Sequence, residues 1–321
     1  FVRGELPAAH SHAEAMLALA EHRGDPALRL TGLNATGMTL MMMGQLASAR
    51  TNLEAALDIH AALEDALPPT RFVQDPEVEA CLSLALVTWL VGEPRQARSL
   101  AERAVAVAVA NRHPISEVSG LYGAAMLHAL AGEFDTVYAL TERLYGVIRD
   151  QEVPQQHSGF AWLHGRALVA LGRVEEGMEE MRAAKRTALE LGFRFSLGDF
   201  HVHYAEVCRE GGQHAEADAS IDAGLALARD SGEQLMLSAM LRLQAQRQAE
   251  RGDLPAATRT FDRAIETARA QGAVFHELAA LATAQRMGCT NADPDRLARL
   301  LEHYDGDASP VIVAARVLLR Q

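Results

Sequence analysis

The sequence has few of the residues on which several kinds of functional site depend. Lys185 is the single lysine among 30 basic residues, and no glycine loop precedes it. A phosphate-binding G-x-x-x-x-G-K-[ST] loop and a Schiff-base lysine are therefore both excluded. The three cysteines, Cys81, Cys208 and Cys289, are odd in number and far apart. We interpret them as reduced thiols, which favours a cytoplasmic protein over a disulfide-stabilised secreted one.

Long apolar runs and clusters of positive charge are also absent from the sequence. No stretch of about 18 uncharged apolar residues is present, and the first residues lack the layout of a signal peptide. We therefore expect neither a membrane span nor a membrane partner. The formal net charge is −12, and no Lys/Arg cluster is flanked by aromatic residues. Nucleic acid is accordingly not an expected partner of this segment.

Glycine, in contrast, is placed at regular intervals. A first series lies at positions 4, 44, 92, 132, 172, 212 and 252, with intervals of 40 except for one of 48. The sequence GELPAA at Gly4–Ala9 recurs as GDLPAA at Gly252–Ala257, where Pro255 suits the first residue of a helix. A second series at positions 24, 192, 232 and 272 is typical of glycines that end helices in the left-handed conformation. Where such a glycine is missing, Pro114 and Pro154 are expected to stop the helix.

Small residues recur at fixed distances from these glycines, which favours close packing of antiparallel helices. The sequence therefore predicts an all-α, right-handed α-solenoid of helical hairpins with a 40-residue period. Gly37 and Gly165 are expected where two helices meet. The proline-containing insertion 67–76 is interpreted either as a neutral surface loop or as a lid or docking finger. The predicted single domain, 1–321, divides into a half repeat 1–24, repeats 25–66, 76–112, 113–152, 153–192, 193–232 and 233–272, and a C-terminal cap 273–321.

The small residues at three offsets from a turn glycine resemble the tetratricopeptide repeat (TPR) over essentially the whole chain. The period is 40 rather than 34, and the tryptophan and terminal proline of the consensus repeat are absent. The runs Gln74–Gly92 and Gln271–Ala279 are similar to the C-terminal repeat region of large bacterial regulators. Those regulators carry an AAA/STAND signal-transduction ATPase, often fused to adenylate/guanylate cyclase or DNA-binding activator domains. The resemblance implies a sensor and interaction arm. Because only three residues precede Gly4, we expect the natural chain to extend upstream.

Thirteen histidines raise the question of a metal site. His10/His12 and His201/His203 are two residues apart, so on a helix their side chains point about 200° apart and cannot share an ion. Neither an H-E-x-x-H motif nor a G-x-S-x-G nucleophile elbow is present. We expect the histidines on solvated faces or at helix ends, and acidic residues such as Glu179 and Glu180 on solvated faces. No catalytic residue, cofactor or metal is predicted, so this segment is not expected to be an enzyme.

The resemblance also implies where a partner would bind. In TPR arrays the first helix of each unit lines the concave face, and positions 10, 6 and 3 residues before the turn glycine point into it. These offsets select apolar and charged side chains that suit a groove for a peptide or helix. The alternative is that the apolar members belong to the core, with the register shifted by one helical turn. The predicted groove residues are Asn34, Met38, Met41, Leu86, Trp89, Tyr122, Met126, Trp162, Arg166, Glu206, Arg209 and Arg242.

Three functions are compatible with these observations. The first is a non-catalytic C-terminal arm of a multidomain regulator, whose partner is a protein or peptide segment or an adjoining domain of the same chain. The second is a stand-alone adaptor that binds a peptide. The third is a small-ligand sensor, comparable with the repeat domain of the maltose-regulon activator. A P-loop encoded upstream would distinguish the first from the second, and a clustered polar pocket would favour the third. Homo-oligomerisation is left open. If the groove assignment holds, the rings of Trp89 and Trp162 are partly accessible.

Overall fold

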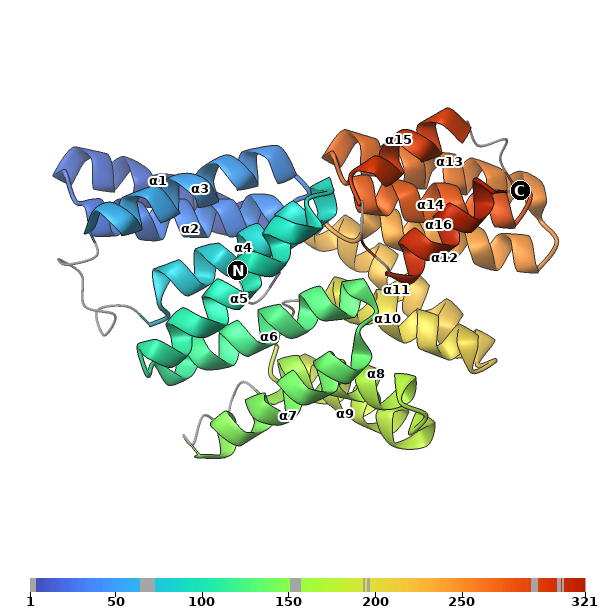
Figure 1. The fold of residues 1–321 in the computed structure, drawn as a ribbon, viewed down its shortest axis with the longest axis horizontal. Coiled ribbons are helices and arrows are strands. Elements are labelled where there is room, and N and C mark those ends of the chain that lie inside the picture. Colours follow the sequence, from blue (N-terminus) through green and yellow to red (C-terminus); the bar gives the residue numbers. More distant parts are fainter. Residues whose placement is uncertain are drawn as a thin grey trace. The chain divides into compact units, whose positions relative to one another are not determined.

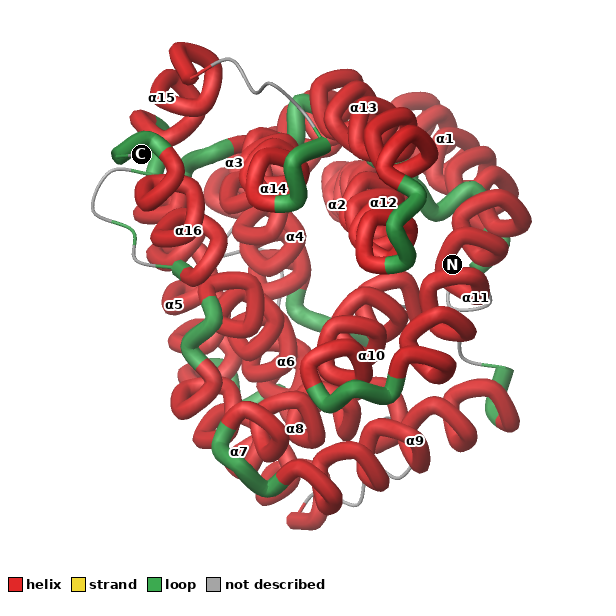
Figure 2. Tube along the Cα trace, turned by 90° about the vertical axis from the view of Figure 1, so that its right-hand side faces the viewer, coloured by secondary structure: helices red, strands yellow, loops and turns green. Residues whose placement is uncertain are grey.

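The structure is a computed structural model that describes residues 4–63, 73–150, 157–192, 194, 197–289, 294–304, 307 and 309–320. Sixteen helices and no strands are found in this described part (Figures 1 and 2). Among these helices, none is long and apolar enough to cross a membrane. Most of the predicted insertion 67–76 lies outside the described residues.

The stretch that was predicted as one domain separates into two compact units. Unit 1 contains Phe1–Thr88 and Arg95–Phe195, and unit 2 contains Ser196–Gln321 together with the short segment Trp89–Pro94. The helices of unit 1 are α1 (Leu6–Arg23), α2 (Pro26–Met42), α3 (Leu46–Leu63), α4 (Pro76–Val91), α5 (Pro94–Ala110), α6 (Pro114–Ala131), α7 (Phe134–Asp150), α8 (His157–Ala170) and α9 (Val174–Glu190). The end of α4 and the first residue of α5 fall in the segment that groups with unit 2.

Apart from the segment Trp89–Pro94, unit 2 begins before α10, and its helices are coloured from yellow to red in Figure 1. Its helices are α10 (Leu197–Glu210), α11 (His214–Ser231), α12 (Leu237–Glu250), α13 (Leu254–Gln271), α14 (Val274–Arg286), α15 (Pro294–Glu302) and α16 (Pro310–Leu318). Within unit 2, α10 to α14 pack each on the next, and α16 packs on α14. The first helices of successive hairpins also touch, α10 with α12 and α12 with α14, as α6 does with α8 in unit 1.

The 40-residue period is confirmed by the helix boundaries. The helices α7, α9, α11 and α13 begin at positions 134, 174, 214 and 254. Every glycine of the two series has a positive φ, between 60° and 100°. Arg112 also has a positive φ, 50°, at the position where the second series would place a glycine. The chain turns near Gly132, Gly172 and Gly212 as expected, so the fold is the predicted all-α solenoid of TPR-like hairpins.

Close approach between helices explains the small residues of the repeat. The hypothetical Cβ atom of an alanine at Gly165 on α8 would lie 2.6 Å from the carbonyl oxygen of Gly177 on α9. At Gly37 on α2, the same atom would lie 2.6 Å from Cγ of Leu53 on α3. The large apolar side chains nine residues after the turn glycine fill the space behind these contacts, since Leu53, Ile221 and Phe261 are fully buried. The prediction that helices meet at Gly37 and Gly165 is therefore confirmed.

Candidate binding face

Eight of the predicted groove residues lie in unit 1, on the first helices of its hairpins. Met38 on α2 and Leu86 on α4 are half-buried. The other six are buried: Asn34, Met41, Tyr122, Met126, Trp162 and Arg166.

Asn34 connects two of these first helices. Its side-chain amide donates a hydrogen bond of 2.9 Å to the backbone oxygen of Pro76, at the start of α4. It also bonds to the carboxyl of Glu79 on α4. Burial raises the pKa of Glu79 to about 7, and the bond from Asn34 opposes that increase. Asn34 therefore fastens α2 to α4 in addition to any role that it has in binding.

The tryptophans are much less accessible than expected. Trp162 is 3% exposed, and Trp89 is 0% exposed. Trp89 belongs to the segment that groups with unit 2, and its ring centroid lies 5.8 Å from that of Phe275 and 6.2 Å from that of Tyr304. The prediction that both indole rings are partly accessible is wrong, because packing between helices covers them. Whether the predicted groove residues bind a partner stays a prediction.

The three predicted groove residues on α10 and α12 of unit 2 are charged and carry ion pairs. Arg242 on α12 donates to Glu206 on α10 over 2.6 Å. Arg209 on α10 donates to Glu250 on α12 over 2.6 Å. These pairs join the first helices of two successive hairpins, so their charges are compensated within unit 2.

A buried histidine from the next hairpin adjoins one of these pairs. His276 on α14 is 4% exposed. Burial, together with the nearby positive charge of Arg242, lowers the pKa of His276 to about 4, while Glu206 acts in the opposite direction. The imidazole is therefore neutral at physiological pH. Three successive first helices, α10, α12 and α14, thus contribute to one polar cluster, in which His276 is buried and Arg242 and Glu206 are half-buried.

Arg166 differs from the other charged groove residues because it lacks a carboxylate partner in the described part of the chain. Its guanidinium carbon lies 4.2 Å from the centroid of the Phe134 ring, at the start of α7. The residue is 7% exposed, and its Nε atom is buried with no hydrogen-bond partner. The cation–π contact stabilises the side chain but provides no acceptor for its N–H donors.

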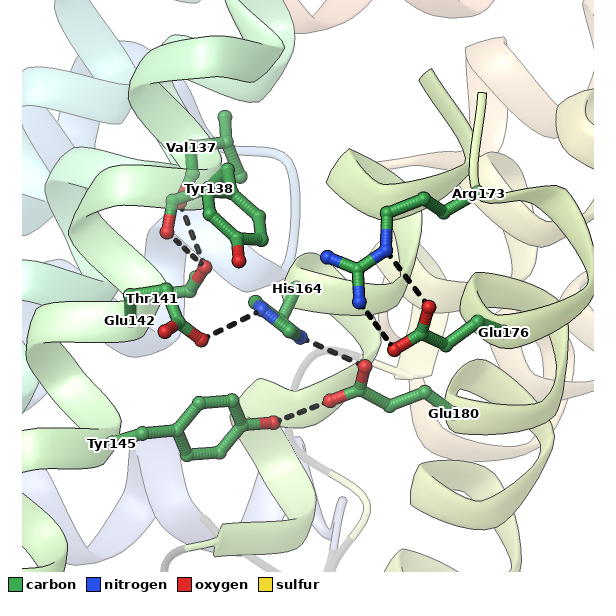
Figure 3. A network of polar contacts seen from close by, with 9 residues as sticks. All are labelled: Val137, Tyr138, Thr141, Glu142, Tyr145, His164, Arg173, Glu176 and Glu180. Atoms are coloured by element: carbon green, nitrogen blue, oxygen red, sulfur yellow. Dashed lines mark hydrogen bonds and ion pairs between the residues drawn. The ribbon is translucent and has the colours of Figure 1, made fainter. Parts of the chain in front are cut away.

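A polar network in unit 1 joins α7, α8 and α9 (Figure 3). His164 on α8 has Nδ1 2.8 Å from an oxygen of Glu180 and Nε2 3.1 Å from an oxygen of Glu142. The hydroxyl of Tyr145 donates to the other oxygen of Glu180 over 2.7 Å. Tyr138 stacks on the imidazole, and Tyr145 meets it edge-on, both with centroids 5.2 Å away. Burial and the bond to Glu180 raise the pKa of Tyr145.

This network serves to hold helices together. Both ring nitrogens of His164 face carboxylate oxygens, so neither is placed to bind a metal ion or to take a proton from a substrate. The expectation of solvated or helix-end histidines is wrong for His164, His201, His203 and His276, which are buried. Glu180, which was expected on a solvated face, bonds to both His164 and Tyr145. The spacing of Tyr138, Glu142 and Tyr145 by four and three residues on one helix face is the signal that could have indicated the network.

Two buried acids in unit 2 were not identified from the sequence. Asp199 in the first turn of α10 and Glu233 before α12 are each 6% exposed. Burial raises the pKa of Asp199 to about 7. Burial, and then the nearby Asp199, raise the pKa of Glu233 to about 8. Gly198 leaves the space that the Glu233 carboxyl occupies, since a Cβ there would collide with Oε1. The acids are 34 positions apart, so no short motif connects them.

A groove in unit 1 lies between α5, α6 and α7. It has a volume of about 430 Å³ and is lined mainly by aliphatic side chains. Its three basic side chains already have carboxylate partners. Arg98 and His128 both bond to Glu133, and Arg143 bonds to Glu117. No set of three or more His, Cys, Asp or Glu residues in the described part of the chain is placed to hold a metal ion.

Comparison with known proteins identifies the fold. No protein-family model and no curated protein matches the sequence. A solved structure of a Rap protein complexed with Competence and Sporulation Factor is similar with a TM-score of 0.57 and 10% identity, covering 99% of this chain and 97% of that one. The apo form of RapI has a TM-score of 0.52 and 12% identity, covering 91% and 98%.

A human IFIT1 dimer with m7Gppp-AAAA has a TM-score of 0.43 and 13% identity, covering 98% of this chain and 68% of that one. This score is too low to support an argument. The two Rap structures show that the chain has the fold of a helical-repeat solenoid.

Proposed function

We propose that this chain is a non-catalytic scaffold that binds a protein or peptide segment on the first helices of its hairpins. The main support for this proposal is the similarity to the structure of a Rap protein complexed with Competence and Sporulation Factor, because this similarity extends over almost the full length of both chains. The TPR-like hairpins support it, since such repeats present side chains from successive helices to one extended ligand. The net charge of −12 favours a protein or peptide partner over nucleic acid.

We further propose the cellular context of the scaffold. The runs similar to the repeat region of bacterial regulators support a role as the cytoplasmic C-terminal arm of a multidomain signal-transduction ATPase or cyclase-type regulator. The partner is then the adjoining domain or an external peptide. Sequencing the gene upstream of the Phe1 codon tests this context. A reading frame that continues into a P-loop ATPase is expected, whereas a start codon just before Phe1 would leave the stand-alone adaptor.

The buried positions of the acids and bases with shifted pKa values support the non-catalytic part of the proposal. Asp199, Glu233 and His276 have strongly shifted pKa values, but each is buried by packing and none lines the groove of unit 1. The purified chain is expected to show no turnover of ATP above that of a mock purification. The same groove gives little support to a small-ligand sensor, because its lining is mainly aliphatic and its basic side chains are paired with glutamates of the chain.

Binding itself is tested with a defined probe and a matched pair of variants. Random dodecapeptides displayed on phage are selected on the purified chain, and selected peptides are measured by calorimetry. Leu86→Ala should weaken binding by about 1 to 2 kcal/mol, because Leu86 is a predicted groove residue that keeps some exposure. Leu19→Ala, on the exposed side of α1, should leave binding unchanged. Failure to select any peptide, or equal effects of the two substitutions, would contradict the proposal.

A further inference from the structure

The starting point is a positive charge that is buried in unit 1 without a negative partner. Arg166 forms no hydrogen bond or ion pair with any described residue, and its contact is the face of the Phe134 ring. Arg209 and Arg242, the other two arginines among the predicted groove residues, are each paired with a glutamate. Among the arginines of the predicted groove, Arg166 is therefore the one without a carboxylate partner in the described part of the chain.

Leaving a charged group unpaired in the interior is unfavourable, because the group loses water and gains no compensating hydrogen bonds. The attraction to the Phe134 ring offsets part of this loss. A methionine, which is similar in length to the arginine stem, would fill the same space without the penalty. Packing therefore does not explain the arginine, and its N–H donors remain available to an acceptor from outside the chain.

We propose that Arg166 is the anchor for a carboxylate group of the bound peptide. This inference rests on the proposed function and specifies its ligand class. A guanidinium presents its N–H donors in a planar fork that matches the two oxygens of a carboxylate. The carboxylate belongs to an Asp or Glu side chain or to the peptide C-terminus, and these sources have the same chemistry.

The test uses random nonapeptide libraries that are acetylated at the N-terminus. One library has a free C-terminal carboxylate and a second is amidated, and each is made with and without Asp and Glu. The bound peptides are identified by mass spectrometry, and affinities are measured by fluorescence anisotropy. The parent chain should prefer carboxylate-bearing peptides at least tenfold. The amidated and Asp/Glu-free libraries show whether the carboxylate is terminal or in a side chain.

Three variants of the full chain separate an anchor from a structural residue. Arg166→Met should lose the tenfold preference while melting at the same or a higher temperature, because an unpaired buried charge is removed. Arg166→Lys should keep part of the preference, because the charge remains but the planar fork does not. Arg186→Met makes the same exchange at an exposed arginine of α9 and should change neither property.

The outcomes distinguish this inference from the proposed function. If Arg166→Met melts at a clearly lower temperature than the parent chain, the arginine is a structural group and the inference is overturned. If the parent binds peptides with and without carboxylates equally, the scaffold function stands and the carboxylate anchor is wrong. If no library yields a bound peptide, the proposed function fails and the anchor fails with it.

Discussion

Arg112 adopts a backbone conformation that the repeat requires but that is unfavourable for a residue with a side chain. It ends α5 with a φ of 50°, in the position that Gly192, Gly232 and Gly272 occupy in other hairpins. A left-handed conformation is unfavourable for residues with a Cβ atom and easy for glycine. Helix packing therefore imposes the turn, and the side chain tolerates it.

Arg112→Gly is expected to increase the free energy of unfolding by about 1 kcal/mol, because glycine adopts the required φ without strain. Arg186→Gly is the control, since it places the same residue within α9, where it should decrease the free energy of unfolding by about 1 kcal/mol. Urea denaturation at equilibrium measures both. Equal signs for the two substitutions would contradict the explanation.

Glu233 leads to a prediction about pH. In the unfolded chain, Asp199 and Glu233 have ordinary pKa values and lose their protons near pH 4, whereas in the folded chain they hold them up to about pH 7 and 8. Unfolding therefore releases protons between these limits. The contribution of the two acids to stability decreases as the pH rises from about 4.5 to 8.

Glu233→Gln should remove part of this decrease, because the amide cannot ionise. We expect the free energy of unfolding to change little at pH 5 and to increase by about 1 to 3 kcal/mol at pH 8.5 relative to the parent. Denaturant titrations across this range provide the measurement. Glu266→Gln, at an exposed position of α13, should show no such trend. Parallel stability curves for Glu233→Gln and the parent would refute the prediction.

At the scale of elements, the contact between α8 and α9 tests the packing of the repeat most directly. Gly165 and Gly177 face each other, and the backbone of each helix occupies the space that a side chain would need on the other. A neighbouring backbone cannot move aside as a flexible side chain can. The requirement for small residues at these offsets is thus a requirement on the distance between helices.

Gly165→Ala should lower the free energy of unfolding by about 1 to 3 kcal/mol, because the new methyl group would lie 2.6 Å from the Gly177 oxygen. Gly146→Ala is the matched control within α7, where nothing lies within 4 Å of the added atom. It should raise the free energy of unfolding by about 0.5 to 1 kcal/mol, because alanine favours helix. Thermal melts that do not separate the two variants would reject the packing assignment.

At the scale of the whole molecule, stability should be local. Repeat proteins hold each hairpin mainly through its nearest neighbours, so damage in one hairpin spreads weakly. Gly165→Ala should therefore increase amide hydrogen exchange in α8 and α9 more than in α12 and α13 of unit 2. Mass spectrometry of proteolytic fragments measures this pattern. A uniform increase over both units would indicate a single cooperative structure instead.

Helix boundaries could be predicted from the sequence because they depend on local chemistry. A glycine such as Gly24 or Gly92 ends a helix through its own φ, and a proline two residues later begins the next helix. The fold class followed from the repetition of these signals. Close contacts at Gly37 and Gly165 were predictable for the same reason, since their small size recurs at a fixed offset.

Exposure and pairing of side chains could not be predicted in the same way, because they depend on other hairpins. Trp162 is covered by packing that an offset from Gly172 does not reveal. The partner of Arg242 lies 36 positions away on α10, and nothing in the local sequence indicates it. The groove offsets were taken from a shorter repeat, so they do not specify which side chains stay exposed.

The similar conformation of the turn glycines has a consequence for the ancestry of the chain. The turns at Gly212 and Gly252 have φ values of 71° and 84° and are each followed by a helix that begins two residues later. If the segment 213–252 were excised, the turn at Gly212 would be joined to the helix that now follows the equivalent turn at Gly252. If the segment were duplicated in tandem, the turn at Gly252 would be joined to a second copy of the helix that now follows Gly212. Gene recombination at these points changes the number of hairpins without creating a new junction. Proteins of this kind can therefore lengthen or shorten by one hairpin at a time, in steps of 40 residues.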